Sequence, residues 1–531
     1  MTSHKEAFAA SRSTLAAATP PGTVLIEEHD RANETSRKVY FPPPSADPRD
    51  PLNLPQWHKT AALIVVSLYA FVGNFTSSII APALQIWPME FPQEQKTVPQ
   101  LTYLIAVHVL FLGAGNVIWV PLSNWLGRRP VLLAATLMMT LASVWCGLAT
   151  SYNSLLAARI FQGLGGAASD TVAPALIGDL YFIHQRGRAM ALYTIMLCAG
   201  PIVGGIAGGY LAFLHGWRSI FLVSIALSGL CFFGVAFFVP ETLFERILPL
   251  AEDLRPGSPS QTKEAHATHS ETEPEPGPTY KPHTFSSTLW FKPRNNNRTL
   301  LQHFVRPWRT LTLPGVWIVM LQYSGLVGGT VTISTVGPQI LAMPPYLWKE
   351  KVGLINLGGL IGALLGYLYT HFLSDRAMAR GARKAAHRGT AEAEDRLPTL
   401  FLPLAIATGG FFVFGFCVQY PAPDRWVGLM FGFGMVAFGL MQVPSVGFNY
   451  LIDSYGQLAP DCFTVVTILR SIIAFAWSFF VAEWVQSRGG AEPFGIFGML
   501  MGIFSILTVP VWIWGKRMRL ATASKVQRWA L

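Results

Sequence analysis

Two charged residues, Arg159 and Asp170, lie within a segment that is otherwise apolar enough to cross a bilayer. Charges are costly to insert there, so a chain that keeps them usually uses them along an ion or substrate path. A buried carboxyl such as Asp170 can exchange a proton for a cation, because burial disfavours its charged form and a positive charge restores it. A buried guanidinium such as Arg159 keeps its proton and needs a carboxylate, a carbonyl or an anion as partner. This chemistry indicates proton-coupled transport, and static structural roles for both side chains are the alternative.

Two further ionisable side chains lie in predicted spans. His108 titrates near neutrality and is a candidate for relaying protons or binding substrate, with a satisfied core histidine as the alternative. Arg470 also needs an acid or a carbonyl, and the sequence does not name one. Arg159 and Asp170 are three helical turns apart and share a helix face without touching. Asp170 has no obvious counterpart in the second half, so we predict proton coupling in the first half, by Asp170, Arg159 and His108.

Membrane-spanning helices must position these residues. Of 531 residues, 51% are hydrophobic and only 13% are charged, whereas soluble domains carry about a quarter charged residues. A spanning helix needs about 20 mainly apolar residues. The sequence predicts twelve such spans: 60–82, 99–120, 130–150, 154–180, 187–214, 217–240, 313–340, 351–373, 399–420, 426–450, 461–485 and 492–515.

The basic residues predict the orientation of these spans. The net charge is +10, but Lys and Arg fall in short loops, mostly on one side of the predicted membrane. That bias predicts two cytoplasmic termini and argues against a nucleic-acid-binding face. We expect no cleavable signal peptide in the polar, Pro-rich start of the chain. The predicted parts are a cytoplasmic N-terminal tail (1–58), an N-terminal six-helix bundle (59–240), a largely disordered cytoplasmic linker that ends in an interfacial piece (241–312), a C-terminal six-helix bundle (313–515) and a cytoplasmic C-terminal tail (516–531).

The two halves repeat weakly. The segment 121–130 after the second span has a counterpart at 372–376 after the eighth, and 177–181 after the fourth span has one at 451–455 after the tenth. Two related six-span bundles are a transporter architecture, with the substrate held between them near mid-membrane. We therefore predict an all-α membrane protein with twelve transmembrane helices in two pseudo-symmetric six-helix bundles.

These segments resemble motifs of the major facilitator superfamily, and more closely those of the twelve-span fungal drug:proton antiporters. The loop 121–130 is similar to the family's loop between spans two and three, with Asn124 where an acid is usual. Residues 155–165 are similar to the fourth-span motif, and 200–205 to the fifth-span antiporter motif. The resemblance covers residues from about 45 to 515. It implies the fold of that family and associates the arginine at 159 with proton transfer.

Two groups of residues are candidates for gating. Gly200, Pro201, Gly204 and Gly205 predict a kinked, tightly packed fifth span that seals one side of the pathway, with ordinary glycine packing as the alternative. Polar and charged residues at the inner ends of spans predict a network that clamps the bundles together, with simple positive-inside anchoring as the alternative. This network comprises Asn124, Gly127, Arg128, Arg129, Asp179, Arg186, Arg188, Asp375, Arg376 and Asp453.

Polar residues within the spans are candidates for a substrate cavity, although such residues often only make interhelical hydrogen bonds. A mainly apolar cavity with a few polar groups suits amphipathic organic molecules. The candidates are Asn74, Ser77, Ser78, Gln322, Tyr323, Gln442 and Asn449. No Gly-x4-Gly-Lys-Ser/Thr sequence occurs, which disfavours an ATP-driven pump or an enzyme. The five cysteines form no CxxC pair, so we expect no disulfide framework, no metal site and no cofactor.

The sequence thus predicts a secondary active transporter that exports small organic molecules, such as a drug, toxin or secondary metabolite, by proton-coupled alternating access. Its expected partners are the lipid bilayer, the small organic substrate and protons, and it is expected to act as a monomer in the plasma membrane. A proton-driven importer of organic cations or polyamines is the first alternative. A non-transporting membrane receptor with a transporter fold is the second.

Overall fold

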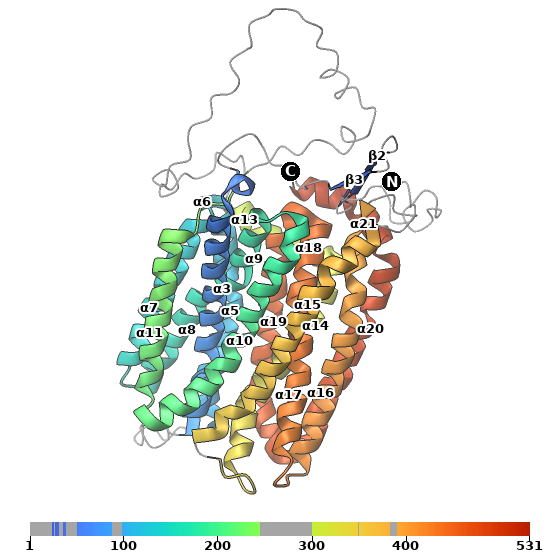
Figure 1. Cartoon of the computed structure of the whole chain (residues 1–531). Helices are drawn as coiled ribbons and strands as arrows, with labels where there is room; N and C mark the ends of the chain where they lie inside the picture. Colours follow the sequence, from blue (N-terminus) through green and yellow to red (C-terminus); the bar gives the residue numbers. More distant parts are fainter. Residues whose placement is uncertain are drawn as a thin grey trace, which may run out of the picture.

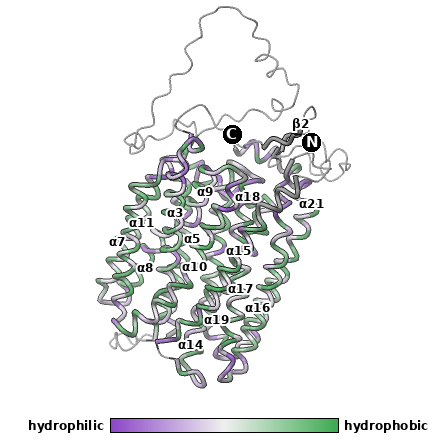
Figure 2. Tube along the Cα trace, in the orientation of Figure 1, coloured by the Kyte–Doolittle hydropathy of each residue, from purple (hydrophilic) through white to green (hydrophobic). Residues whose placement is uncertain are grey.

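Nearly all of the described chain is helical, and its long helices run side by side in two bundles (Figure 1). The computed structural model describes residues 24–25, 27–30, 35–38, 50–85, 87, 98–244, 300–348, 350–382 and 390–530. Hydrophobic residues predominate along the helices and hydrophilic ones gather toward their ends (Figure 2). This distribution fits helices whose middles lie in lipid.

The N-terminal bundle contains six spans, of which the second and the fourth are interrupted. Short 3₁₀ turns, η1 (Pro51–Asn53) and η2 (Ala81–Gln85), flank its first helix. The helices are α3 (Gln56–Ser78), α5 (Val98–Ala114), α6 (Asn116–Leu126), α7 (Arg128–Leu148), α8 (Tyr152–Gly166), α9 (Ala168–Leu180), α10 (Ile183–His215) and α11 (Arg218–Phe238). Within the bundle α3 packs on α10, and α8 lies between α5 and α7.

The C-terminal bundle repeats this arrangement. It is preceded by α13 (Leu300–Arg309) and η4 (Thr310–Thr312), and α13 packs on α6 and α19. Its elements are α14 (Pro314–Ala342), η5 (Glu350–Ile355), α15 (Asn356–Ala382), η6 (Ala393–Leu400), α16 (Phe401–Gln419), α17 (Trp426–Gln442), a π-helical turn η7 (Val443–Gly447), α18 (Phe448–Tyr455), η8 (Gly456–Leu458), α19 (Ala459–Arg488), α20 (Ala491–Ile506) and α21 (Thr508–Ala530). The final helix extends beyond the predicted boundary at 515.

Eleven helical segments of the described chain are long and apolar enough to cross a membrane. The predicted fourth span supplies the twelfth as α8 and α9, which are too short to count singly. The all-α, twelve-helix architecture is therefore confirmed. Helices α8 and α9 together occupy the predicted fourth span and are separated only at Ala167, whose backbone keeps helical dihedrals (φ −58°, ψ −39°). The glycines at 165 and 166 lower the helix propensity just before this break.

The bundles meet along two helix pairs. α5 of the first bundle packs on α19 of the second, and α10 packs on α15. Helices α5 and α19 are spans two and eleven, and α10 and α15 are spans five and eight. The repeat relates span two to span eight and span five to span eleven, so it converts one contact pair into the other. The interface itself thus carries the pseudo-symmetry that the sequence repeat predicts.

Both ends of the helical region of the chain lie at the same end of the molecule, where α3 begins and α21 finishes (Figure 1). We call this the termini end. Short antiparallel strand pairs also occur in the described residues: β1 (Val24–Leu25) with β4 (Thr390–Ala391), and β2 (Glu27–Asp30) with β3 (Thr35–Lys38). Most of the predicted linker, residues 245–299, lies outside the described chain.

Candidate functional site

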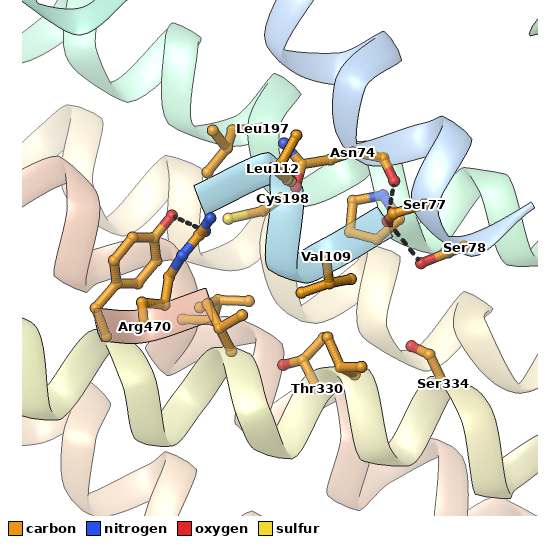
Figure 3. A pocket seen from close by; sticks show the side chains of 15 residues that line it. Asn74, Ser77, Ser78, Val109, Leu112, Leu197, Cys198, Thr330, Ser334 and Arg470 are labelled. Atoms are coloured by element: carbon orange, nitrogen blue, oxygen red, sulfur yellow. Dashed lines mark hydrogen bonds between the residues drawn. The ribbon is translucent and has the colours of Figure 1, made fainter. Parts of the chain in front are cut away.

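A cavity of about 40 Å³ lies between the two bundles. Asn74, Ser77 and Ser78 on α3 line it from the first bundle, and Thr330 and Ser334 on α14 line it from the second (Figure 3). Most of the remaining lining is apolar and comes from α5, α10, α14 and α17. A mainly apolar lining with a few polar groups is typical of sites for organic molecules. At this volume the cavity has room for water-sized groups, so a larger ligand requires the bundles to move apart.

A buried ion pair joins the bundles beside this cavity. The guanidinium of Arg470 on α19 contacts the carboxylate of Asp170 on α9, and the side chains are 3% and 1% exposed. Arg470 also donates to the hydroxyl of Tyr323 at 3.1 Å and lies over its ring, 4.8 Å from the centroid. Arg470 and Tyr323 line the cavity, whereas Asp170 lies behind them. The partner that the sequence could not name for Arg470 is therefore Asp170.

The same contact links Asp170 to the second bundle. The sequence places proton coupling in the first half because Asp170 has no counterpart in the second. In the structure the carboxylate is instead neutralised by a residue 300 positions later. Ser169 lies beside the carboxylate, with its Oγ 3.4 Å from Oδ1, and Tyr193 donates to the Ser169 carbonyl at 2.8 Å. A change of charge on Asp170 would thus act on both bundles.

Arg159 lies apart from this pair and is held by neutral acceptors. Its guanidinium donates to the carbonyl oxygens of Leu104, Thr76 and Ser77 at 3.1, 2.7 and 3.2 Å. It also donates to Oε1 of Gln162 at 2.5 Å. These contacts join α8 to α3 and α5. They fit the alternative in which Arg159 has a structural role and holds helices of the first bundle together through backbone carbonyls.

His108 on α5 is fully buried and does not line the cavity. Its Nε2 lies 3.4 Å from the carbonyl oxygen of Gly73 on α3. The contact is at the long limit for a hydrogen bond. The ring is therefore packed against α3, inside the first bundle.

Helix α10 presents glycines on two faces. A Cβ at Gly200 or Gly204 would overlap a backbone carbonyl of α3, so these glycines let two helices of one bundle approach closely. A Cβ at Gly205 would overlap the side chain of Asn356 at the start of α15, in the other bundle. Pro201 lies inside α10 between these positions and lines the cavity. The predicted Gly-Pro segment therefore contacts both bundles and the cavity.

A second link between the bundles lies at the termini end. Arg186 of α10 forms an ion pair with Asp453 of α18 and donates to Oδ1 of Asn449 at 3.2 Å. The second carboxylate oxygen of Asp453 is 3.1 Å from Nε of Arg396 in η6. Asn449 is a predicted cavity residue, but it belongs to this network and does not line the cavity.

Within the first bundle, a separate network surrounds the loop between α6 and α7. Arg128 Nε is 3.3 Å from Asp179, and the carboxylate of Glu241 accepts the backbone N–H groups of Arg128 and Arg129 at 2.9 and 3.1 Å. An acid at a helix N-terminus stabilises it through these free N–H groups. Gly127 has φ +112°, and a Cβ there would overlap Glu241. The positive φ favours glycine here, and a larger residue would also displace the Glu241 carboxylate.

The remaining predicted residues are dispersed. Gln322 donates to the carbonyl of Phe504 at 3.2 Å and to Thr508, and Gln442 donates to the carbonyl of Gly366 at 2.9 Å, so neither lines the cavity. Asn124 is partly buried at the end of α6, and Arg188 is exposed. The side chains of Asp375 and Arg376 lie outside the described part of the chain.

A third acidic and basic cluster was missed from the sequence. Arg519 of α21 contacts both Glu392 and Glu394 next to η6, and Lys516 lies 2.7 Å from Glu392. Burial raises the pKa of Glu392, but Arg519 and Lys516 outweigh burial and hold that pKa below its usual value. The sequence signal for this cluster was the group of acidic residues at 392–395, whose negative charges needed basic residues nearby.

No group that could hold a metal ion is found among the described residues. The five cysteines are buried free thiols. Cys198 lines the cavity beside Arg470. The chemistry of the site is therefore that of an ion pair, hydroxyls and an apolar wall.

Comparisons with known proteins agree with this architecture. The family model for the Major Facilitator Superfamily matches residues 64–476. An uncharacterized MFS-type transporter of Schizosaccharomyces pombe is 24% identical, over 95% of this chain and 93% of that protein. The efflux pump radE of Floropilus chiversii is 27% identical, over 83% of this chain and 78% of that protein. The solved structure of the proton:xylose symporter XylE is 16% identical with a TM-score of 0.55, covering 86% of this chain and 95% of that one.

Proposed function

Because this chain belongs to the major facilitator superfamily and is a multi-pass membrane transporter rather than an enzyme, we propose that it exports small organic molecules in exchange for protons. The proposal includes alternating access, with the cavity between the bundles as the substrate site. It also includes location in the plasma membrane with the termini end in the cytoplasm. Positive residues concentrated at that end support this orientation.

The observation that carries the proposal is the buried pair of Asp170 and Arg470 beside the cavity. Protonation of Asp170 would remove the negative charge that neutralises Arg470. A buried charge without a partner is strongly unfavourable, so the arrangement of the two bundles would respond to the proton. One protonation step would thus bias an equilibrium between two conformations.

The termini-end link supplies the second element of the cycle. Arg186 and Asp453 connect the bundles on the proposed cytoplasmic side. A substrate entering from the cytoplasm requires this link to open, and release outside requires it to close again. Ion pairs that form in only one conformation are a common basis for such switching.

The names of two relatives favour export over import. Efflux pump radE of Floropilus chiversii and efflux pump FUB11 of Gibberella moniliformis are both 27% identical to this chain. The names describe those proteins, and they support the same direction of transport here.

The experiment is transport of a candidate compound into everted membrane vesicles with an imposed pH gradient. Export predicts uptake that is driven by vesicles acidic inside. An importer requires the opposite gradient, and a receptor binds compound without flux; either result would reject the proposal. Asp170→Asn should abolish the dependence on the gradient. Glu492→Gln, which removes a carboxylate that is 42% exposed in a surface pair, is the matched control and should leave it unchanged.

A further inference from the structure

The cavity has an unusual balance of charge. Among the described residues, Arg470 is the sole charged residue in its lining, and none of the lining residues carries a carboxylate. The negative charge of Asp170 is engaged by Arg470 from behind the cavity wall. The pair is neutral as a whole, but it turns its positive end toward the cavity. A cationic ligand would meet the guanidinium without a free acid to bind it.

Three polar groups in this wall have unused hydrogen-bonding capacity. Within the described residues, Nε of Arg470 and the hydroxyls of Thr330 and Ser334 have no hydrogen-bond partner. All three side chains are at least nine-tenths buried, with exposures of 3, 4 and 5%. Buried polar groups are normally satisfied, so such groups facing a cavity indicate that a ligand or water completes them.

The geometry of the hydroxyls strengthens this argument. Thr330 and Ser334 are four residues apart on α14, which places them one helical turn apart on the same face. Figure 3 shows both side chains directed from α14 toward the space opposite Ser77 and Ser78. Ser77 already donates to the carbonyl of Asn74 at 2.6 Å, so the unused capacity lies mainly on the α14 and α19 side.

We infer that the cavity binds organic molecules that carry an acceptor oxygen, a carbonyl or carboxylate, on an apolar body, and that it disfavours organic cations. An arginine can only donate hydrogen bonds, and each hydroxyl can donate one. Each hydroxyl can also accept, but the guanidinium cannot, so a ligand that completes the Nε of Arg470 must supply an acceptor. The hydroxyls of Thr330 and Ser334 can donate to further acceptor atoms of the same ligand. This inference specifies the substrate class and rests on the proposed transport function. It argues against the alternative of an importer of organic cations or polyamines.

The test is equilibrium binding to the purified full-length protein in lipid nanodiscs, without a proton gradient. The probes are benzamide, benzoate and benzylammonium, which share one apolar body and differ in the polar group. Benzamide and benzoate should bind at least about tenfold more tightly than benzylammonium, a difference of about 1.4 kcal/mol. Equal or tighter binding of benzylammonium, or no binding of any probe, would overturn the inference.

Variants locate the binding on α14. Thr330→Val and Ser334→Ala each remove one donor with little change of shape and should weaken benzamide binding about threefold to tenfold. Ser324→Ala is the matched control, because Ser324 is buried on the same helix and does not line the cavity. Unchanged benzamide affinity in both test variants would refute the assignment. Binding without gradient-driven flux would instead reject the transport proposal alone, and flux of a cationic probe would reject this inference alone.

Discussion

Removing one partner of the Asp170–Arg470 pair should destabilise the protein at least as much as removing both. The two side chains are 1% and 3% exposed, so water cannot solvate the charge that a single substitution leaves behind. Breaking a buried pair in this way costs about 3–5 kcal/mol. We therefore expect about that loss of unfolding free energy for Asp170→Asn and for Arg470→Gln separately.

The double variant Asp170→Asn/Arg470→Gln leaves no buried charge. Its loss should be no larger than that of either single variant, which gives a coupling energy of at least about 3 kcal/mol. The unfolding free energy is measured by titration with SDS, followed by tryptophan fluorescence. The surface pair Arg488 and Glu492, whose side chains are 67% and 42% exposed, is the control and should show coupling below about 1 kcal/mol.

The same variants separate stability from coupling. The double variant should fold, yet its flux should no longer depend on the pH gradient, because the carboxyl that accepts the proton is gone. Two results would refute the reasoning. One is single-variant losses below about 1 kcal/mol that simply add in the double variant. The other is gradient-driven flux that persists in a folded Asp170→Asn protein.

Three further outcomes follow from other contacts. Gly208→Ala should destabilise by about 1–3 kcal/mol in the SDS titration, because a Cβ there overlaps the backbone carbonyl of Ile79, the residue that follows α3. Gly229→Ala, with nothing within 4 Å, should not destabilise. In a protein whose only remaining cysteine is Cys198, Arg186→Gln should speed labelling of Cys198 by an impermeant maleimide added at the termini end. An unchanged labelling rate would contradict the proposal that Arg186 and Asp453 hold this end closed. Because the pKa of Glu392 is lowered, its contribution is present above the unfolded pKa of about 4.3 and is lost as pH falls through the lower folded value. Glu392→Gln should flatten the loss of unfolding free energy between about pH 5 and pH 3, and an unaltered slope would count against the cluster.

The number of spans was predictable because lipid imposes it locally. About 20 consecutive apolar residues suffice to identify a spanning helix, whatever its neighbours are. The break at Ala167 was harder to predict, because glycines inside membrane helices more often serve close packing than interruption. Apolar length thus gives the segments but not their internal geometry.

The cavity could be predicted only in part. Asn74, Ser77, Ser78 and Tyr323 line it, but Gln322 turns toward α20 and α21 although it neighbours Tyr323 in the chain. Adjacent residues on a helix point about 100° apart, and a helix that is apolar all round does not reveal which face meets the pathway. The partnership of Asp170 with Arg470 was likewise invisible, since it joins two helices across the bundle interface.

The proposed alternating access requires that the two sides of the path never open together, and the two cross-bundle links provide a physical basis for this. Asp170 with Arg470 lies beside the cavity, and Arg186 with Asp453 lies at the termini end. In the proposed mechanism, protonation of Asp170 would weaken only the first link, and the second would still hold the termini end closed. A proton alone would then favour a rearrangement near the cavity without opening a leak through the molecule. Opening toward the termini end requires the second link to break as well, which makes the open state depend on both events.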